Sequence, residues 1–393
     1  MSSTLSSAKS PRLEVVDALR GFAIMAIMLL HNIEHFDFYF FPEYLPSWLK
    51  TTDKAIWDTM FFLFGGKAYA IFALLFGLTF YIMFSNQAHK GKDFRGRFLW
   101  RSLLLFGFGI LNSLFYQGDI LLFYAVLGVT LVIVCKWSDK AVLITAIILL
   151  LQPLEWIKLF QIINDTTFVA SDPPSWAYFG KTGEYLSNGS LFDVLKGNIT
   201  TGKTAVILWT YESGRTLQTP ALFMLGMLLG RKNLFALSGS GKKFWEKVLI
   251  YAITLFVILF VVKLYIPNLG FREAVSGSIV SIITSWANFA FMFMLVSTFV
   301  LVFQRNTIHR VLTKLEVFGK MSLTNYVMQS IMGSCIYYGF GLGLYKYTGA
   351  TFSLLIGIVL FLLQYAFCRW WMKSHTHGPL EGVWHRLTWI GKD

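Results

Sequence analysis

The residues best suited to chemistry lie in the first apolar stretch of the chain. In a helix, a stripe about 60° wide holds four of its ionisable side chains. They are Asp17, Arg20, His31 and His35. Arg20 and His31 are separated by about 16 Å of helical rise, so a guanidinium that holds an anion would lie below an imidazole that moves a proton. The other interpretation is a polar stripe that joins neighbouring helices, with Asp17 and Arg20 as an i,i+3 pair.

Two further basic residues lie inside apolar stretches, where an unpaired charge is costly and often marks a site. Lys67 follows Gly65 and Gly66 and needs an anion or another acceptor, such as a phosphate or a carbonyl group of a ligand, Asp58 or Asp17. Arg101 follows a dense basic run and could bind the phosphate groups of a ligand. The loop part of this run could also anchor the chain by the positive-inside rule.

Three polar residues elsewhere are candidates for supporting roles. Asp119 lies in a tight turn, where its carboxylate could orient His31 or His35, or could cap the following helix. Asn325 and Gln329 are four residues apart on one helix face. Their amides could bind a ligand amide or join two helices.

The composition indicates the elements that must position these residues. Only 14% of the 393 residues are charged and 55% are hydrophobic, whereas soluble domains carry about 25% charged residues. The net charge of +13 is spread over many short loops, which excludes the basic patch typical of a nucleic-acid partner. The sequence therefore predicts an all-α polytopic bundle in contact with membrane lipids.

Apolar runs bounded by charges predict about ten transmembrane spans. They lie near 13–36, 56–84, 98–116, 120–135, 141–160, 206–230, 248–266, 275–303, 321–345 and 350–372. Most Lys and Arg residues of the loops fall on one side, so the positive-inside rule predicts that both termini are cytoplasmic. The spans form two five-helix halves, 1–160 and 206–393, joined by a turn-rich extracytoplasmic segment, 161–205, that caps the outer face.

Several other motifs resemble functional patterns but lack residues that those patterns require. The stretch SGSGKK near residue 240 lacks the first Gly and the final Ser or Thr of a phosphate loop. His375 and His377 could bind a metal only with two more ligands that the nearby sequence does not offer, so no metal site is predicted. The three cysteines lie in or beside apolar runs and do not indicate a disulfide scaffold.

The first stretch resembles a known enzyme family. VVDALRGFAIMAIMLLH is similar to the opening of the membrane-bound acyltransferase family three, whose first helix carries an Arg and a His separated by ten residues. Arg20 and His31 match this spacing. The resemblance implies that Arg20 contributes to donor binding and that His31 acts in acyl transfer.

A larger part of the chain resembles the bacterial YeiB-like membrane proteins. The similar motifs are FGGKAYAIFALLFGLTFY, GDILLFYAVLG, RTLQTPALFMLGMLLGR, FGKMSLTNYVMQS and GPLEGVWHRLTW. By this resemblance the chain is grouped with transmembrane acyltransferases such as the heparan glucosaminide acetyltransferases, and it is expected in the bacterial inner membrane. Many YeiB-like relatives have Asn where this chain has His31. Either His31 restores the acyltransferase pattern, or His35 is the catalytic histidine and His31 supports it.

We therefore expect a membrane enzyme that moves an acyl group, most simply acetyl, from cytoplasmic acyl-coenzyme A to a hydroxyl or amine of an extracytoplasmic glycan or related acceptor. The predicted catalytic residues are His31, His35 and Asp119, with Glu34 as another group that could orient the base. Arg20, Lys67, Arg101, Asn325 and Gln329 are predicted to bind the donor. A transporter of small molecules or lipids would use the same buried charges. The sequence leaves a homodimer open.

Overall fold

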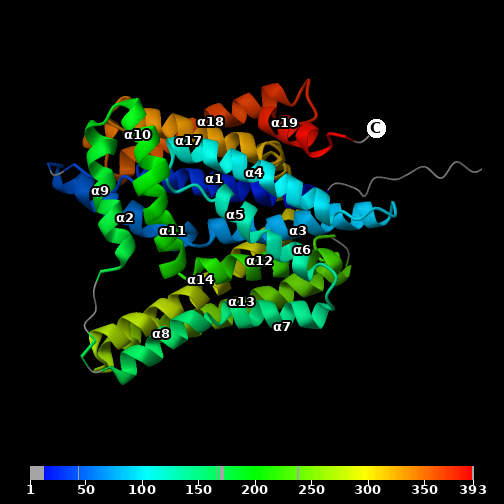
Figure 1. Cartoon of the computed structure of the whole chain (residues 1–393), viewed down its shortest axis with the longest axis horizontal. Helices are drawn as coiled ribbons and strands as arrows, with labels where there is room; N and C mark the ends of the chain where they lie inside the picture. The colour runs from blue at the N-terminus through cyan, green and yellow to red at the C-terminus, as the bar shows by residue number, and fades with distance from the viewer. Residues whose placement is uncertain (1–12, 43, 166, 169–171, 237–238, 392–393) are drawn as a thin grey trace, which may run out of the picture.

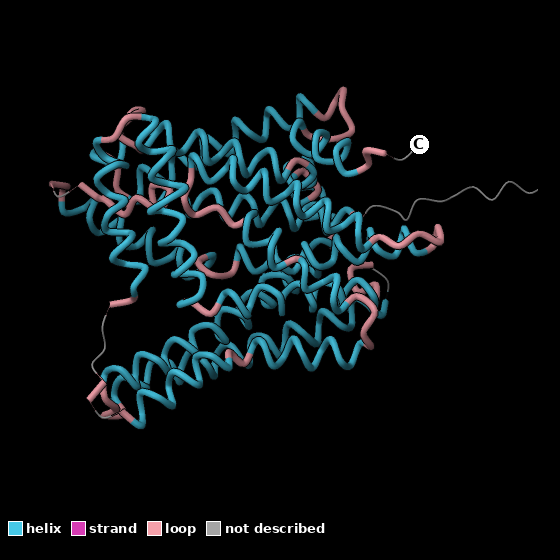
Figure 2. Tube along the Cα trace, in the orientation of Figure 1, coloured by secondary structure: helices cyan, strands magenta, loops and turns pink. Residues whose placement is uncertain are grey.

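The computed structural model describes residues 13–391 except 43, 166, 169–171 and 237–238. Within these residues the regular secondary structure is all helical, without a strand (Figure 2). This confirms the predicted all-α class. The helices are α1 (Glu14–Ile33), α2 (Ser47–Phe64), α3 (Ala68–Ala88), α4 (Arg95–Phe115), α5 (Leu121–Leu127), α6 (Val129–Val134), α7 (Asp139–Leu150), α8 (Pro153–Asn164), α9 (Pro174–Asn188), α10 (Leu191–Gly197), η1 (Asn198–Gly202), α11 (Lys203–Glu212), α12 (Arg215–Arg231), α13 (Gly239–Tyr265), η2 (Ile266–Asn268), α14 (Glu273–Phe303), α15 (Asn306–Leu312), α16 (Leu315–Lys320), α17 (Ser322–Tyr337), η3 (Leu344–Lys346), α18 (Ala350–Trp371) and α19 (Pro379–Thr388).

Seven helical segments of the described chain are long and apolar enough to cross a membrane, judged by length and composition. They are Glu14–Ile33, Ser47–Ala88, Arg95–Phe115, Asp139–Asn164, Gly239–Asn268, Glu273–Phe303 and Ala350–Trp371. A further apolar run, Leu121–Val134, is shorter. The chain is therefore a polytopic membrane protein by these criteria, while the number of ten spans and the cytoplasmic termini stay predictions.

Helix α1 lies in the middle of the bundle (Figure 1), where it packs against α3, α16, α17 and α18. Helix α12 packs against α3 and α7, and the long pair α13 and α14 lies beyond it with α8. Helices α9, α10 and α11 gather at the end of the bundle where α1 ends, and α19 lies at the opposite end. We call these two ends the His31 side and the Arg20 side.

The contact between α3 and α12 depends on two glycines. A Cβ atom at Gly77 would overlap the carbonyl oxygen of Phe223, and one at Gly226 would overlap the carbonyl oxygen of Leu74. The two backbones therefore approach as closely as the missing side chains allow, which is the common way for helices to pack within a membrane.

The predicted span at 56–84 is wrong as a single helix, because the chain divides it into α2 and α3. Gly66 between them has a φ of 73°, a conformation that glycine adopts without steric cost. The break is enclosed by other helices, since the ring of Phe64 lies 5.9 Å from that of Phe22 on α1. The bundle thus contains a discontinuous helix.

Other predicted spans are also divided, among them 120–135, which forms α5 and α6 on either side of Gly128. The span at 141–160 breaks between α7 and α8, where Gln152 is left-handed with a φ of 57° and Pro153 begins the next helix. The span at 206–230 breaks at Gly214, so that α11 is a separate helix. The segment 161–205 contains α9 and α10 and is more helical than its turn-forming residues predict.

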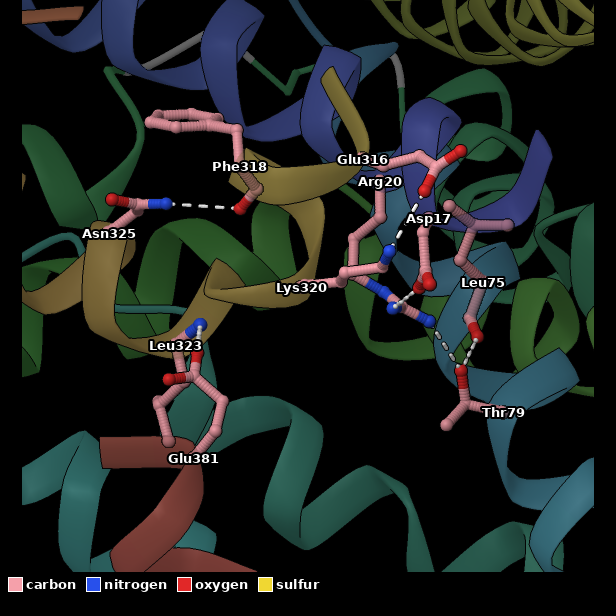
Figure 3. A network of polar contacts seen from close by, with 10 residues as sticks. All are labelled: Asp17, Arg20, Leu75, Thr79, Glu316, Phe318, Lys320, Leu323, Asn325 and Glu381. Carbon is pink, nitrogen blue, oxygen red and sulfur yellow. Dashed lines mark hydrogen bonds and ion pairs between the residues drawn. The ribbon is translucent and has the colours of Figure 1, made fainter. Parts of the chain in front are cut away.

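The last helix, α19, is fixed to α4 and α17 on the Arg20 side. The Glu381 carboxylate accepts the backbone N–H groups of Leu323 and Thr324 at 2.7 and 3.0 Å (Figure 3 shows the first). These are unpaired donors of the first turn of α17. The guanidinium of Arg97 donates to the carbonyl oxygen of Thr388 at 2.8 Å, which caps the other end of α19.

Candidate functional site

Arg20 is held in place by two neighbours. Its Nη1 atom lies 2.8 Å from the Asp17 carboxylate, and its Nη2 donates to the Thr79 hydroxyl at 2.9 Å (Figure 3). The predicted i,i+3 pair is thus present. Because a guanidinium has five N–H donors, these two bonds leave others for a ligand.

Asn325 and Gln329 differ although they lie on one face of α17. Asn325 joins elements, because its amide donates to the Phe318 carbonyl oxygen at 3.0 Å and accepts from the Cys368 thiol at 3.2 Å. The Gln329 side chain is fully buried, and neither its Nε2 nor its Oε1 has a hydrogen-bond partner among the described residues. Unpaired buried polar atoms cost about 1–3 kcal/mol each, so Gln329 is the better candidate for a ligand contact.

Arg101 contacts α19. Its guanidinium carbon lies 3.4 Å from the centre of the Trp384 ring, and one nitrogen donates to the Thr388 hydroxyl at 3.3 Å. The indole of Trp384 donates back to the Arg101 carbonyl oxygen at 3.1 Å. These contacts join α4 to α19, so donor binding by Arg101 would have to use its remaining N–H groups.

Lys67 lies at the break between α2 and α3, where none of the described residues provides it with an anionic partner. Its Nζ donates to the Phe61 carbonyl oxygen at 3.3 Å and lies 5.4 Å from the centre of the Phe291 ring. No carboxylate of the described residues lies within 4.0 Å of it. The predicted partners Asp58 and Asp17 are instead paired with Lys54 and Arg20.

His31 occupies an aromatic environment at the other end of α1. Its ring centre lies 4.7 Å from that of Tyr116, 5.6 Å from Phe36 and 6.4 Å from Tyr326. Its Nδ1 atom is buried and has no hydrogen-bond partner among the described residues. An imidazole nitrogen of this kind is able to accept a proton from a bound molecule.

Both ring nitrogens of His35 make hydrogen bonds within the protein. Its Nδ1 lies 3.0 Å from the Phe40 carbonyl oxygen, and its Nε2 lies 2.8 Å from the Ser353 hydroxyl. Burial lowers the pKa of His35 to about 4, so the ring is neutral at physiological pH. With both nitrogens in use, His35 has no free atom with which to act as a base.

His35 also begins an unusual turn. His35, Phe36 and Asp37 have φ values of 51°, 56° and 63°, which side chains rarely adopt and which cost roughly 1–2 kcal/mol each. The turn is held by His35 and by the Tyr338 hydroxyl, which donates to the Phe36 carbonyl oxygen at 2.7 Å. Strain of this size persists where surrounding contacts impose it, and it clusters at functional sites.

Asp119 caps a helix, as one of its two predicted roles requires. Its carboxylate accepts the backbone N–H of Leu122 at 3.0 Å and the amide of Asn112 at 2.8 Å. The hydroxyl of Tyr326, whose ring lies near that of His31, accepts a hydrogen bond from the Ile120 backbone N–H group at 3.2 Å. Asp119 therefore positions the surroundings of His31 but makes no hydrogen bond to it.

The structure adds several residues that the sequence did not single out as site residues. We call the whole group the His31-side cluster, and it consists of His31, Glu34, Asp37, Tyr116, Lys203 and Arg215. The strained turn places Asp37 beside Tyr116, whose hydroxyl hydrogen-bonds the carboxylate. A Cβ atom at Gly118 would overlap both groups, so this arrangement requires glycine there.

The outer helices enclose this cluster. Tyr185 of α9 donates to the Gln117 side chain at 3.1 Å and lies 3.3 Å from the Asn198 amide oxygen. The buried Lys203 donates from Nζ to the Gln117 carbonyl oxygen at 2.8 Å. The segment predicted as an outer cap therefore contributes a cation to the cluster.

The two carboxyl groups of the cluster hold protons unusually tightly. Burial and repulsion from Asp37 raise the pKa of Glu34 to about 8. Burial raises the pKa of Asp37 to about 6, although its bond from Tyr116 and the charges of Lys203 and Arg215 oppose this. Titratable groups with strongly perturbed pKa values cluster at functional sites.

These shifts predict a pH dependence of stability. Glu34 binds its proton more tightly in the folded chain, so its stabilising contribution is complete below its unfolded pKa of 4.5 and is lost as the pH rises through about 8. Between about pH 7.5 and 8.5, His35 is largely neutral in both the folded and the unfolded state, since its unfolded pKa is 6.5. We expect the melting temperature of the purified protein to fall across this window, and less steeply in Glu34→Gln.

Glu184→Gln provides the control for this prediction, because Glu184 is exposed at the same end of the bundle. This variant should keep the slope of the unchanged protein. An identical slope in Glu34→Gln would contradict the assignment of the shift to Glu34.

Sequence signals for these residues exist but are weak. Arg215 begins the motif RTLQTPALFMLGMLLGR and follows Gly214, a position that starts a helix. Asp37 lies among aromatic residues directly after the first apolar stretch. Lys203 has no local signal, because its burial depends on contacts with Gln117, 86 positions earlier in the chain.

A cavity of about 280 Å³ lies on the Arg20 side beside α19. Its lining includes His375, His377, His385 and Arg386. The rings of His377 and His385 stack with their centres 4.9 Å apart. Within the described residues no group of three or more His, Cys, Asp and Glu side chains could hold a metal ion.

The fold and the site define a polytopic helical membrane protein with polar groups at both ends of its central helix. Residues 229–391 match the family model described as "Protein of unknown function (DUF418)".

Three relatives match almost the whole chain. "Uncharacterized protein YxaH" of Bacillus subtilis (strain 168) is 27% identical, over 99% of this chain and 97% of the relative. "Uncharacterized 39.9 kDa protein in amylase 3'region" of Bacillus acidopullulyticus is 24% identical, over 97% and 95%. "Uncharacterized protein YeiB" of Escherichia coli (strain K12) is 26% identical, over 95% of both chains. These similarities support a YeiB-like family.

Proposed function

We propose that this protein is a membrane acyltransferase that takes an acyl group, most simply acetyl, from acyl-coenzyme A on the Arg20 side to a hydroxyl or amine on the His31 side. The main support is the buried Nδ1 of His31, which has no partner among the described residues and lies at the end of the helix that begins near Arg20. In this proposal the Arg20 side is cytoplasmic and the acceptor is a glycan or related molecule outside.

The residues present fit a thioester donor. Arg20 retains free N–H groups for a phosphate or a carbonyl group. Gln329 offers a buried amide with both polar atoms unpaired among the described residues, which suits the amide groups of a pantetheine arm. These two side chains carry the donor assignment, because Arg101 and Asn325 already serve to join helices.

In the proposed reaction His31 acts as the general base. Its Nδ1 takes the proton of the acceptor as the acceptor oxygen or nitrogen attacks the thioester carbonyl carbon. The carbon–sulfur bond breaks, the leaving thiolate takes up the proton that His31 removed from the acceptor, and the acyl group stays on the acceptor. Tyr326 accepts a hydrogen bond from Ile120 and keeps its own O–H to stabilise the developing oxyanion.

Donor binding is tested by thermal unfolding of the purified protein. A ligand that binds only the folded state stabilises it, so coenzyme A at about 100 times its Kd should raise the melting temperature by about 5 °C. The shift should be smaller in Arg20→Ala and in Gln329→Leu.

Arg231→Ala is the matched control for Arg20→Ala. Arg231 is also ion-paired, to Asp139 at 2.9 Å, and bonds to carbonyl oxygens, so its loss removes similar structural contacts. Coenzyme A should raise the melting temperature of Arg231→Ala as much as that of the unchanged protein. Absence of any shift in the unchanged protein with coenzyme A or acetyl-coenzyme A would remove the donor assignment.

A transporter is the second candidate, and the break between α2 and α3 is the observation that favours it. Discontinuous helices form substrate sites in many transporters, and here the break holds Lys67 without a carboxylate within 4.0 Å among the described residues. Reconstituted vesicles distinguish the two functions. A transporter accumulates an unchanged substrate, whereas the proposed enzyme consumes acyl-coenzyme A and releases its free thiol.

A further inference from the structure

Arg215 is fixed between two aromatic rings. Its guanidinium carbon lies 4.1 Å from the centre of the Tyr69 ring on α3 and 4.1 Å from that of Trp209 on α11. Stacking on aromatic rings is favourable for this planar cation. Neither ring face offers an oxygen acceptor, and no hydrogen bond of the guanidinium to a described residue accompanies these contacts, so its N–H groups are available to a ligand.

The guanidinium forms no ion pair with the part of the chain that the structure describes. Its positive charge acts on Glu34 and Asp37, yet no carboxylate oxygen of the described residues lies within 4.0 Å of it. It makes no hydrogen bond to another described side chain. Arg215 is therefore close enough to the acidic groups to affect their protonation and too far to be neutralised by direct contact.

Lys203, like Arg215, is a cation of the cluster that forms no ion pair with a described carboxylate. Its side chain is 8% exposed, and its Nζ donates to a backbone carbonyl oxygen. No carboxylate of the described chain lies within 4.0 Å of Nζ. Lys203 and Arg215 both act on Asp37, which places the two cations around the same carboxyl group.

The charges around Arg215 leave it able to bind an anionic ligand. The raised pKa of Glu34, about 8, keeps this group largely protonated at neutral pH. Asp37 is then the carboxyl group that acts on both cations, and Asp119 acts on Lys203 in addition. Arg215 is also the first residue of α12, and the N-terminus of a helix adds partial positive charge. A simple charge-neutralising role for Arg215 would instead require an ion pair, and none is formed among the described residues.

We propose that Arg215 and Lys203 bind an anionic group, a phosphate or a carboxylate, on the molecule that meets His31. This inference rests on the proposed function only in making that molecule the acyl acceptor. The acceptor would then be a phosphorylated or acidic glycan or polyol rather than a neutral sugar. The edge of a guanidinium suits both groups, because it forms two parallel hydrogen bonds to their oxygens.

Thermal unfolding without any acyl donor tests this inference. The soluble probes are glycerol 3-phosphate and glucuronate, with glycerol and glucose as their neutral counterparts. Nanodiscs of phosphatidylcholine with and without phosphatidylglycerol test a lipid phosphate. At least one anionic probe should raise the melting temperature by about 5 °C at about 100 times its Kd, and the neutral probes should not.

The variants identify the binding residue. Arg215→Gln should lose the shift, and Arg215→Lys should retain a smaller one because a lysine keeps the charge but not the paired donors. Lys181→Gln is the control, since Lys181 is an exposed cation at the same end, over the Tyr178 ring. It should keep the whole shift.

Each outcome decides the inference. A shift with any one anion that depends on Arg215 supports it and identifies phosphate, carboxylate or lipid as the source. If no anion stabilises the protein, or if Arg215→Gln is stabilised equally, the inference is wrong. Anion binding that persists in a protein without acyl transfer would refute the proposed function and leave the anion site in place.

Discussion

His31→Ala should lower the turnover of acyl transfer about 100- to 10,000-fold, the usual contribution of general acid–base catalysis. The buried Nδ1 of His31 is the atom we expect to take the acceptor proton, and alanine removes it. Donor binding depends on Arg20 and Gln329, so coenzyme A should still raise the melting temperature of this variant. Turnover is measured by release of the free thiol in vesicles or nanodiscs.

His35→Ala is the companion variant and should behave differently. His35 holds the strained turn through Phe40 and Ser353, so alanine should lower the melting temperature and leave turnover per folded molecule within a few-fold of normal. Full activity of His31→Ala with loss of activity in His35→Ala would transfer the role of base to His35. If both variants still acylate normally, the polar stripe of α1 has a structural role and no catalytic one.

Gly226→Ala should destabilise the protein strongly. Its added methyl group would overlap the carbonyl oxygen of Leu74 on α3, and backbone atoms cannot move aside cheaply. Overpacking of this kind costs about 1–3 kcal/mol or more. Gly77→Ala should have a similar effect, because it acts on the same interface from the other helix. Melting temperature and the yield of folded protein from membranes measure the loss.

Gly107→Ala is the control for these substitutions. Gly107 lies inside α4, and a Cβ atom there would meet nothing within 4 Å. Alanine favours a helix by about 1 kcal/mol relative to glycine, so this variant should be neutral or slightly more stable. Equal behaviour of Gly226→Ala and Gly107→Ala would show that the interface between α3 and α12 is looser than described.

The sequence predicts the class and the central helix well. Hydropathy alone leads to an all-helical chain with several membrane-crossing segments, and the helical period places Arg20 and His31 on one face of α1. Both inferences depend on local properties of the chain. The breaks at Gly66, Gln152 and Gly214 are harder to predict, because a glycine or a proline inside an apolar run is also tolerated within continuous membrane helices.

The rest of the candidate site depends on tertiary contacts that no local pattern encodes. His31 and His35 look equivalent in the sequence, four residues apart on one stripe. They differ because Ser353 of α18, 318 positions away, occupies the Nε2 of His35, whereas the Nδ1 of His31 meets no such group among the described residues. Lys203 and Arg215 likewise join the cluster only when α11 folds over the turn after α4.

The attachment of α19 to α4 has a consequence for the biogenesis of the protein. Arg97 and Trp100 bind the carbonyl oxygens of Thr388 and Leu387, which lie 291 and 287 positions later in the chain. Because translation adds about 5–20 residues per second, α4 is synthesised roughly 15–60 s before α19. A ribosome that stalls before residue 379 leaves the guanidinium of Arg97 and the indole of Trp100 without these hydrogen-bond partners on the Arg20 side.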